Sequence, residues 1–318
     1  MSALLEVRAL SRYFKVATGV LHAVDDVSFR IEAGKTLGIV GESGCGKSTL
    51  GRTMLRLQEP TAGRIFFDGM DITAFSREEM RQMRRYMQII FQDPYASLDP
   101  RLTIAQSIEE PLKVFFPKMS ERERRERIES LMELVGLSRR ALNAYPHEFD
   151  GGRRQRVVIA RALAAEPRFV VCDEPVSALD VSVQAQILNL MMDLQERLHL
   201  TYVFISHDLS VVRHISDHVG VMYLGQLVEY ADEETLFQAP AHPYTQALLS
   251  AIPSVDLDAR RERVLLRGEI GSPIDPKPGC RFAPRCGYAC PACSAGDVAL
   301  EQIGSEHYVA CTRCGAPS

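Results

Sequence analysis

The stretch TLGIVGESGCGKST occupies residues 36–49. Its first part, TLGIV, is apolar and reads as a buried strand, and Gly41, Gly46, Lys47 and Ser48 then fit the pattern G-x-x-x-x-G-K-[ST]. Such glycines let successive backbone N–H groups turn inward, and a helix beginning near Ser48 adds positive potential at its N-terminus. The stretch therefore predicts a strand, a phosphate-binding loop and a helix that together hold a nucleoside triphosphate.

We expect the loop as a whole to contact the phosphates, with separate roles for two of its side chains. Lys47 would neutralise charge on the terminal phosphates, and the Ser48 hydroxyl would ligate magnesium. The residues assigned to nucleotide binding are Gly41, Glu42, Ser43, Gly44, Cys45, Gly46, Lys47, Ser48 and Thr49.

An acidic pair follows a second apolar run farther along the chain. The run FVVC at 169–172 reads as a buried strand, and Asp173 and Glu174 come directly after it. Open parallel sheets bind their ligands at the carboxyl ends of their strands. Asp173 is suited to hold magnesium directly or through water, and Glu174 is suited to orient or deprotonate an attacking water. The pair predicts that the nucleotide is hydrolysed.

Short apolar runs alternate with segments of helical periodicity over most of the chain. Further strands are expected at 202–205 and 219–223, and a helix is expected at 183–198, where apolar residues recur at helical spacing. This alternation predicts an α/β fold with a buried parallel sheet. The charge-rich stretch at about 93–160 reads as an inserted helical subdomain, and the run ERERRER at 121–127 within it reads as a solvated helix face.

The composition is that of an ordinary globular protein, with 318 residues, 46% of them hydrophobic and 25% charged. The formal net charge of −4 argues against a nucleic-acid partner held mainly by phosphate neutralisation. Three prolines interrupt the longest uncharged run, 235–255, and exclude a membrane-spanning helix there. Glu6 and Arg8 interrupt the only apolar stretch at the N-terminus, which therefore lacks a secretory signal core. We expect a cytosolic chain that reaches a membrane only through partners.

A segment shortly before the acidic pair resembles one known family specifically. EFDGGRRQRVVIARAL at 148–163 is similar to the signature segment of the ATP-binding cassette (ABC) family, and other motifs of that family are in order along the chain. The resemblance implies a P-loop ATPase domain with a RecA-like parallel sheet core, N-terminal antiparallel strands and the inserted helical subdomain. It also implies magnesium-dependent ATP hydrolysis, in which the residues outside the loop are Gln92 (Q-loop, also on magnesium), Asp173, Glu174, Asp180 (D-loop), His207 (γ-phosphate sensor), and Tyr13 or Phe14 (stacking on adenine).

Two cassettes of this family pair head to tail, so that each ATP lies between one chain's loop and the other chain's signature. Where the family has S-G-G-Q, this chain has Asp150, Gly151, Gly152 and Arg153. Aspartate caps a helix as serine does, but it repels the partner's phosphate, and Arg153 offsets only part of that charge. We therefore expect this signature to build a weak site on the partner's ATP, which implies a heterodimer. The alternative is that Asp150 is tolerated with little effect.

The sequence changes character near residue 235, where prolines multiply and periodicity fades. HPYTQALLSAIP and GCRFAPRC resemble the C-terminal region of ATPases from dipeptide and oligopeptide importers, and the likeness covers essentially the whole chain. We expect an ABC domain over 1–234 and a regulatory domain over 235–318.

The resemblance implies a second, different ATPase subunit, two membrane permeases and an external peptide-binding protein, with this chain bound peripherally at the cytoplasmic face of the membrane. Nickel or another small solute is the alternative cargo. A soluble cassette ATPase that transports nothing and a metal-binding regulator with an inert cassette are the alternative functions.

Six of the eight cysteines crowd the C-terminal part of the chain. Spacing alone matches a zinc ribbon, Cys290-x2-Cys293-x17-Cys311-x2-Cys314. The family resemblance instead implies that four thiolates hold a [4Fe-4S] cluster, namely Cys280, Cys286, Cys293 and Cys311. We expect a metal-binding extension with iron–sulfur in preference to zinc, and disulfides least of all in a reducing cytosol.

Overall fold

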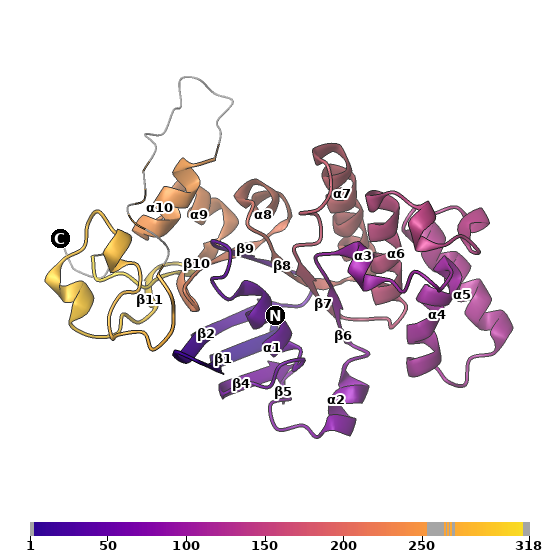
Figure 1. Ribbon diagram of the computed structural model, residues 1–318, viewed down its shortest axis with the longest axis horizontal. Coiled ribbons are helices and arrows are strands. Elements are labelled where there is room, and N and C mark those ends of the chain that lie inside the picture. The colour runs from indigo at the N-terminus through magenta and orange to yellow at the C-terminus, as the bar shows by residue number, and fades with distance from the viewer. Residues whose placement is uncertain (1–2, 253–263, 265, 267, 269–270, 314–318) are drawn as a thin grey trace. The chain divides into compact units, whose positions relative to one another are not determined.

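The computed structural model describes residues 3–252, 264, 266, 268 and 271–313. These residues form two compact units, whose elements are labelled in Figure 1. The helical unit contains residues 32–35 and 74–204. The phosphate-loop unit contains residues 3–31 and 36–73 together with the described residues from 205 onward.

The phosphate-loop unit begins with an antiparallel sheet of strand order β2-β1-β4-β5. Leu5, Val7 and Leu10 of its first strand are buried, while polar residues between them are exposed or half-buried, as expected for a sheet with one covered face. The N-terminal antiparallel strands expected from the family resemblance are therefore present. Their bounds are β1 (Ala3–Val16), β2 (Gly19–Glu32), β4 (Ala62–Phe67) and β5 (Met70–Asp71).

A second run of strands in this unit has the order β11-β12-β10-β9-β3. These strands are β3 (Thr36–Val40), β9 (His218–Tyr223), β10 (Gln226–Asp232), β11 (Glu301–Gly304) and β12 (His307–Val309). β3 pairs with β9 in parallel, but the pairs β9–β10, β10–β12 and β11–β12 are antiparallel. The parallel pairing that the sequence predicts is present between β3 and β9, and the antiparallel strands β10, β11 and β12 make the sheet mixed. Leu224 and Gly225, with φ of 43° and 86°, form a tight hairpin turn between β9 and β10.

Helix α8 packs against β3 at a glycine, where no side chain separates the two elements. A Cβ on Gly38 of β3 would lie 2.4 Å from Val212 Cγ1 of α8, so glycine permits the close approach. The helices of the phosphate-loop unit are α1 (Lys47–Met54), α8 (Leu209–Ile215), α9 (Glu233–Gln238) and α10 (Pro243–Ser250), with 3-10 turns η3 (Ala283–Arg285) and η4 (Pro291–Ser294).

The helical unit contains strands in the order β8-β7-β6, of which β6 and β7 are parallel. They are β6 (Met87–Ile90), β7 (Phe169–Asp173) and β8 (Thr201–Ile205), the last residue of which belongs to the other unit. Every residue of β7 and β8 is buried, which fits sequences that are apolar except at Asp173 and Thr201. The strands predicted at 36–40, 169–172, 202–205 and 219–223 are all confirmed.

Helices make up most of the inserted stretch at 93–160, as predicted. α5 buries Ile128, Leu131 and Met132, whereas its charged first turns are largely exposed and form pairs such as Arg122–Glu126. The helices of this unit are α2 (Arg77–Met83), α3 (Pro94–Ser97), α4 (Ile104–Phe115), α5 (Glu121–Leu134), α6 (Gly151–Leu163) and α7 (Val181–Leu198), with 3-10 turns η1 (Arg139–Ala141) and η2 (Pro146–Glu148).

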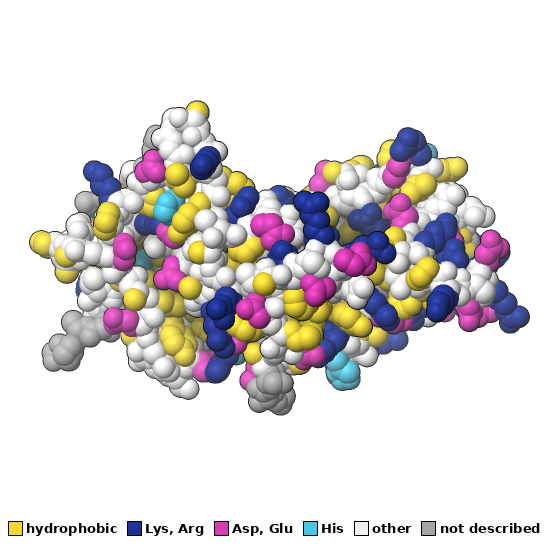
Figure 2. Space-filling view, turned by 90° about the horizontal axis from the view of Figure 1, so that it is seen from below, with side chains coloured by type: hydrophobic (Ala, Val, Ile, Leu, Met, Phe, Trp, Pro, Cys, Tyr) yellow, Lys and Arg dark blue, Asp and Glu magenta, His cyan; other side chains and the backbone are white. Residues whose placement is uncertain are grey.

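Charged side chains of both signs lie interspersed on the face drawn in Figure 2. This mixture fits the small net charge of −4. On that face the described residues form no continuous basic stripe of the kind that follows a nucleic-acid backbone.

Candidate nucleotide site

The predicted phosphate loop connects β3 to α1. Gly46 is the N-cap of α1 and has a φ of 109°, a left-handed conformation that glycine adopts without strain. A Cβ at this position would lie 2.0 Å from the carbonyl oxygen of Ala23. Both the backbone angle and the close approach therefore require glycine at the point where the loop turns into the helix.

Lys47 is the first residue of α1, and its side chain points back into the loop that precedes it. Its side chain is buried, and its Nζ donates to the carbonyl oxygens of Gly41 at 2.7 Å and Glu42 at 3.1 Å. The ammonium group is thus held at the centre of the loop, where it can neutralise a bound phosphate. Burial raises the pKa of the neighbouring Cys45 thiol more than Lys47 lowers it, so Cys45 stays a neutral packing residue.

In the helical unit, Asp173 and Glu174 follow β7 as predicted. Asp173 is buried, and Glu174 has a φ of 49°, which is uncommon for a residue with a side chain. The amide Nε2 of Gln92 donates to Glu174 Oε2 at 2.9 Å. The structure therefore brings together two of the predicted catalytic side chains, from segments that are 82 residues apart in the chain.

Two further motif residues lie at the ends of elements. Asp180 is the N-cap of α7, where its Oδ1 accepts from Val183 N at 3.0 Å and from the Ser182 hydroxyl at 2.7 Å. These hydrogen bonds, that of Ser182 above all, lower the pKa of Asp180 and keep it ionised. His207 comes two residues after β8 and is exposed.

The predicted adenine-stacking residues lie on β1, and the structure gives them different surroundings. The ring of Tyr13 stacks on His22 with ring centroids 4.0 Å apart, and its hydroxyl donates to Asp25. The Arg12 guanidinium lies over the Phe14 ring at 4.4 Å. Tyr13 is therefore the more firmly fixed of the two rings.

The signature segment starts α6. Asp150 is the N-cap, and its Oδ1 accepts from Arg153 N at 2.8 Å, which is the capping role that aspartate shares with serine. Its Oδ2 lies 3.4 Å from Arg153 Nε, and both side chains are more than half exposed. A Cβ on Gly152 would meet Val183 Cγ1 of α7 at 2.6 Å, so this glycine allows the two helices to pack closely.

Several residues that contact the loop, or Asp25 beside Tyr13, were not singled out from the sequence. Tyr244 accepts a hydrogen bond from Glu42 N, Arg285 binds the Glu42 carboxylate, and Arg281 binds Asp25. Tyr244 belongs to the HPY motif, and both arginines belong to GCRFAPRC, so the only available signal was that these two motifs carry the family resemblance.

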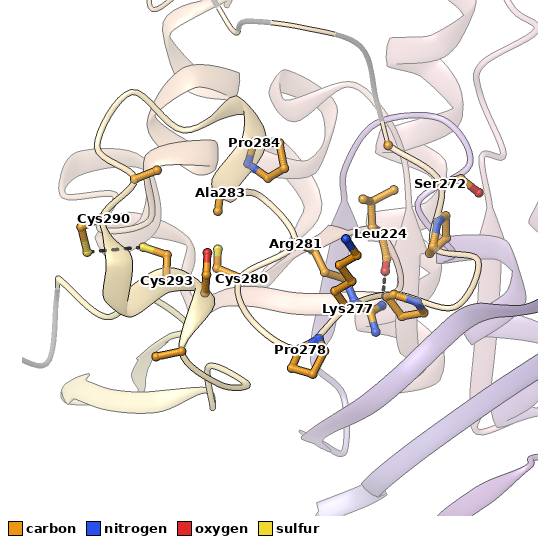
Figure 3. A pocket seen from close by; sticks show the side chains of 16 residues that line it. Leu224, Ser272, Lys277, Pro278, Cys280, Arg281, Ala283, Pro284, Cys290 and Cys293 are labelled. Carbon is orange, nitrogen blue, oxygen red and sulfur yellow. Dashed lines mark hydrogen bonds between the residues drawn. The ribbon is translucent and has the colours of Figure 1, made fainter.

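Part of the cysteine cluster lies around a cavity of about 910 Å³ in the C-terminal segment. Figure 3 shows the sulfur atoms of Cys290 and Cys293 directed toward one another, and they are 3.7 Å apart. Burial raises the pKa values of the Cys280 and Cys286 thiols, and the nearby Cys293 and Cys311 raise them further.

The thiols nevertheless do not form a ligand set in the described chain. No group of three or more His, Cys, Asp or Glu residues among the described positions is arranged to hold a metal ion. The predicted metal-binding extension is therefore not supported by the described part of the chain. Cys314, an alternative ligand, lies outside the described residues. The cysteines of the described part are all unpaired.

Among the described helices, none has the length and apolar character needed to cross a membrane.

Comparisons with known proteins match both parts of the chain. The family model described as ABC transporter matches residues 24–177, and that described as oligopeptide/dipeptide transporter, C-terminal region, matches residues 228–293. The oligopeptide transport ATP-binding protein AppF of Bacillus subtilis is 51% identical over 97% of this chain and 96% of its own length. The dipeptide transport ATP-binding protein DppF of Haemophilus influenzae is 51% identical over the same shares of the two chains.

A solved structure supports the fold of the nucleotide-binding part. The post-hydrolysis dimer of the ATP-binding cassette MJ0796, bound to ADP and Pi, is 29% identical with a TM-score of 0.66, covering 72% of this chain and 98% of that chain. Identity of about half along nearly the full length of both chains leaves no large segment unmatched. The chain therefore belongs to the ABC transporter family, within the group of its peptide-transport ATP-binding proteins.

Proposed function

We propose that this protein is the ATP-hydrolysing subunit of an importer that takes up dipeptides or oligopeptides through separate permease subunits. The observation that carries this proposal is the full-length similarity to AppF and DppF, which includes the C-terminal region at 228–293. A cassette shared with other transporters would account for the first part of the chain alone.

The residues of the phosphate loop supply the binding of ATP. Backbone N–H groups from Gly41 to Thr49 and the N-terminus of α1 attract the phosphates, and the buried Lys47 ammonium neutralises their charge. Oxygen ligands suit magnesium, and the residues that would hold it are Ser48, Gln92 and Asp173. When bound, magnesium neutralises charge that develops on the phosphate oxygens. Tyr13, or Phe14 in its place, stacks on the adenine ring.

Glu174 acts as the general base in this proposal. Its carboxylate accepts the Gln92 amide at 2.9 Å, which fixes the direction in which its remaining lone pairs point. A carboxylate oriented in this way takes a proton from the water that attacks the γ-phosphate. His207 contacts the γ-phosphate, and Asp180 acts at the D-loop next to α7.

Two different ATPase subunits form the complete motor, since this chain's signature suits its partner's ATP poorly. Asp150 places a carboxylate where a serine hydroxyl would otherwise donate to phosphate, and Arg153 at 3.4 Å offsets only part of its charge. The loop of this chain, with Glu174, then forms the competent site together with the signature of the partner. Substituting Glu174 and the corresponding partner glutamate separately tests this, because equal losses of ATPase activity contradict the asymmetry.

The remaining partners follow from the proposed cargo. Two integral-membrane permeases and an extracytoplasmic peptide-binding protein complete the importer, and this subunit binds peripherally at the cytoplasmic face. The C-terminal residues from 235 onward form a regulatory domain that follows the cassette at 1–234.

We also propose that Cys280, Cys286, Cys293 and Cys311 hold a [4Fe-4S] cluster, with zinc as the alternative metal. What supports this is the proximity of the thiols, since Cys293 and Cys311 lie close enough to Cys280 and Cys286 to raise the pKa of those two thiols. Hydrogen bonds from the Cys290 backbone and the Thr312 hydroxyl lower the pKa of Cys293, which favours its thiolate. Stoichiometric iron with visible absorbance in the purified chain supports the cluster, whereas a colourless protein that contains zinc contradicts it.

The function itself is tested with the assembled complex. The chain is co-purified with its permeases, reconstituted into vesicles and assayed for ATP hydrolysis with the binding protein and either peptides or Ni²⁺. We expect peptides to stimulate hydrolysis and Ni²⁺ to have no effect. Stimulation by Ni²⁺ and not by any peptide contradicts the proposed cargo.

A further inference from the structure

Two arginines at 281 and 285 bind Glu42 of the predicted phosphate loop and Asp25, the partner of Tyr13, within the phosphate-loop unit. Arg281 and Arg285 both belong to GCRFAPRC, and the side chain of each is only 8% exposed. Burying two guanidinium groups is costly unless each is paired, and each of them is paired with a carboxylate. We call Arg281 and Arg285 the arginine brace.

Arg285 pairs with Glu42, the second residue of the phosphate loop. Its Nη1 donates to Glu42 Oε2 at 2.6 Å and its Nη2 to Oε1 at 3.1 Å, a two-point contact that fixes the carboxylate in position and direction. Arg285 is the last residue of η3 and directly precedes Cys286.

An aromatic cluster holds the same part of the loop from a second side. The Tyr244 hydroxyl accepts from Glu42 N at 2.9 Å. The Tyr244 ring packs against Tyr223 and Phe282, with ring centroids 4.8 Å and 5.3 Å away. Because Phe282 lies between the two arginines in the chain, burial of its ring fixes the segment that carries the brace.

Arg281 binds residues next to the predicted adenine-stacking residue Tyr13. It donates to Asp25 and to the carbonyl oxygen of Leu224, and Figure 3 shows its side chain extending toward Leu224 and away from Cys290 and Cys293. Asp25 in turn accepts from the Tyr13 hydroxyl and lies 3.0 Å from His22 Nδ1.

Asp25 remains charged in this network. Burial opposes its ionisation, but the hydrogen bonds of Tyr13 and His22 and the charge of Arg281 outweigh that effect and lower its pKa. The stacked pair of Tyr13 and His22 is therefore fixed through Asp25 by a residue of the C-terminal segment.

We propose that Arg285 positions and neutralises Glu42 so that the loop can accept phosphate, and that Arg281 positions the Tyr13 ring for the adenine. The C-terminal segment is then a working part of the ATP site and not only an appendage. This inference rests on the proposed nucleotide-binding role of the loop.

The charge of Glu42 explains why such a residue is needed. A carboxylate on a loop that binds several negative phosphate oxygens repels them, and in a partly buried site the repulsion is poorly screened. Glu42 is only 21% exposed, so water screens its charge only in part. The guanidinium of Arg285 offsets that charge, and its loss would leave an uncompensated carboxylate on the loop.

The test measures equilibrium binding of two magnesium-loaded probes to the full chain, a non-hydrolysable ATP analogue and inorganic tripolyphosphate. Arg285→Met is expected to lower the affinity for both probes about tenfold, since it leaves the charge of Glu42 unpaired. Adding Glu42→Gln to that variant restores both affinities to within about threefold, because the charge is gone. Glu42→Gln alone tightens both, which a general loss of structure would not do.

Arg281→Met is expected to weaken the ATP analogue about fivefold and to leave tripolyphosphate within about twofold, because only the base contact is disturbed. Arg313→Met is the matched control, since Arg313 is an exposed arginine of the same segment, and it should change neither affinity.

Lys47→Ala separates failure of the inference from failure of the proposed loop. If Lys47→Ala abolishes binding while Arg285→Met leaves it unchanged, or while Glu42→Gln fails to restore it, the brace has no positioning role. If Lys47→Ala itself leaves both probes bound, the loop is not the phosphate site and the inference falls with it.

Discussion

Glu174 holds a backbone conformation that costs energy and is retained. Its φ of 49° is left-handed, which costs a residue with a side chain about 1–2 kcal/mol. Such strain persists where the surroundings enforce it, and it is concentrated at functional sites. Together with the hydrogen bond from Gln92, this strain supports the catalytic role that we propose for Glu174.

Glu174→Gln should lower ATP hydrolysis by the assembled importer about 10²–10⁴-fold, because an amide cannot accept the proton of the attacking water. Binding of an ATP analogue should change by less than about threefold, since the phosphate loop is intact. Phosphate release and equilibrium binding measure the two effects. Asp193→Asn on the exposed face of α7 is the control, and hydrolysis that survives in Glu174→Gln contradicts the role.

Gly46→Ala should abolish binding of the ATP analogue, because a Cβ there lies 2.0 Å from the Ala23 carbonyl oxygen and the loop must move. Gly69→Ala is its matched control. Gly69 also has a positive φ, 78°, but a Cβ there meets nothing within 4 Å. Both variants carry backbone strain of about 1 kcal/mol, and only Gly46→Ala should lose binding. Equal binding by the two would show that the close approach is unimportant.

The sequence predicts site residues that lie within one motif, but it does not predict contacts from residues that are distant in the chain. The loop residues and Asp173 with Glu174 could be found because their neighbours in sequence are also their neighbours in the structure. The Arg285–Glu42 pair could not be found, since 243 positions separate the two residues and neither charge is unusual by itself.

Among the elements, α6 depends on its first residue for both stability and function. Asp150→Ala removes the side-chain acceptor of Arg153 N and should lower the free energy of unfolding by about 1 kcal/mol. Asp150→Ser keeps a cap and should lower the free energy of unfolding by only a few tenths of a kcal/mol. Urea unfolding of the full chain measures both, and equal losses in the two variants would show that the cap does not stabilise the helix.

The N-cap of helix α10 is a buried histidine, His242, that should make stability depend on pH. Nδ1 of His242 accepts from Tyr244 N at 3.0 Å, and burial lowers the pKa of His242 from 6.5 to about 4. Between these values the unfolded chain binds a proton that the folded chain does not. Stability is therefore lost as the pH falls from about 6.5 to about 4, by up to about 3 kcal/mol.

His242→Asn keeps a side-chain acceptor for the helix cap and removes the titrating ring. The free energy of unfolding of this variant should therefore fall by about 3 kcal/mol less than that of the unmodified chain over that pH range. Urea unfolding at a series of pH values measures the difference. His199→Asn is the control, because His199 is exposed and its left-handed backbone suits asparagine. Parallel pH profiles for His242→Asn and the unmodified chain contradict the prediction.

Periodicity in the sequence predicts where helices and strands lie more reliably than it predicts which of their residues are buried. The helix expected at 183–198 is α7, and its Ile187, Met191 and Leu194 are buried as the apolar stripe suggests. Leu198, at the end of that stripe, is 42% exposed. The hairpin of β9 and β10 was missed for a different reason, since the turn at Leu224 and Gly225 contains none of the usual Asn-Gly or Asp-Gly signals.

At the scale of the whole molecule, the C-terminal segment and the cassette are parts of one ATPase. The two family matches, at 24–177 and 228–293, cover sequence regions whose residues meet within the phosphate-loop unit. Arg281 and Arg285 from the later region contact Asp25 and Glu42 from the earlier one. The boundary that we expect at residue 234 marks the change in sequence composition, and residues from both sides of it contact one another within the phosphate-loop unit.

The central claim is that ATP hydrolysis by this chain drives peptide uptake. It is tested most directly by peptide accumulation in vesicles that contain the permeases and both ATPase subunits, with the binding protein and peptide on one side and magnesium-ATP on the other. We predict uptake that requires ATP and falls to background when this chain carries Lys47→Ala. Peptide uptake that continues undiminished in Lys47→Ala would contradict the claim.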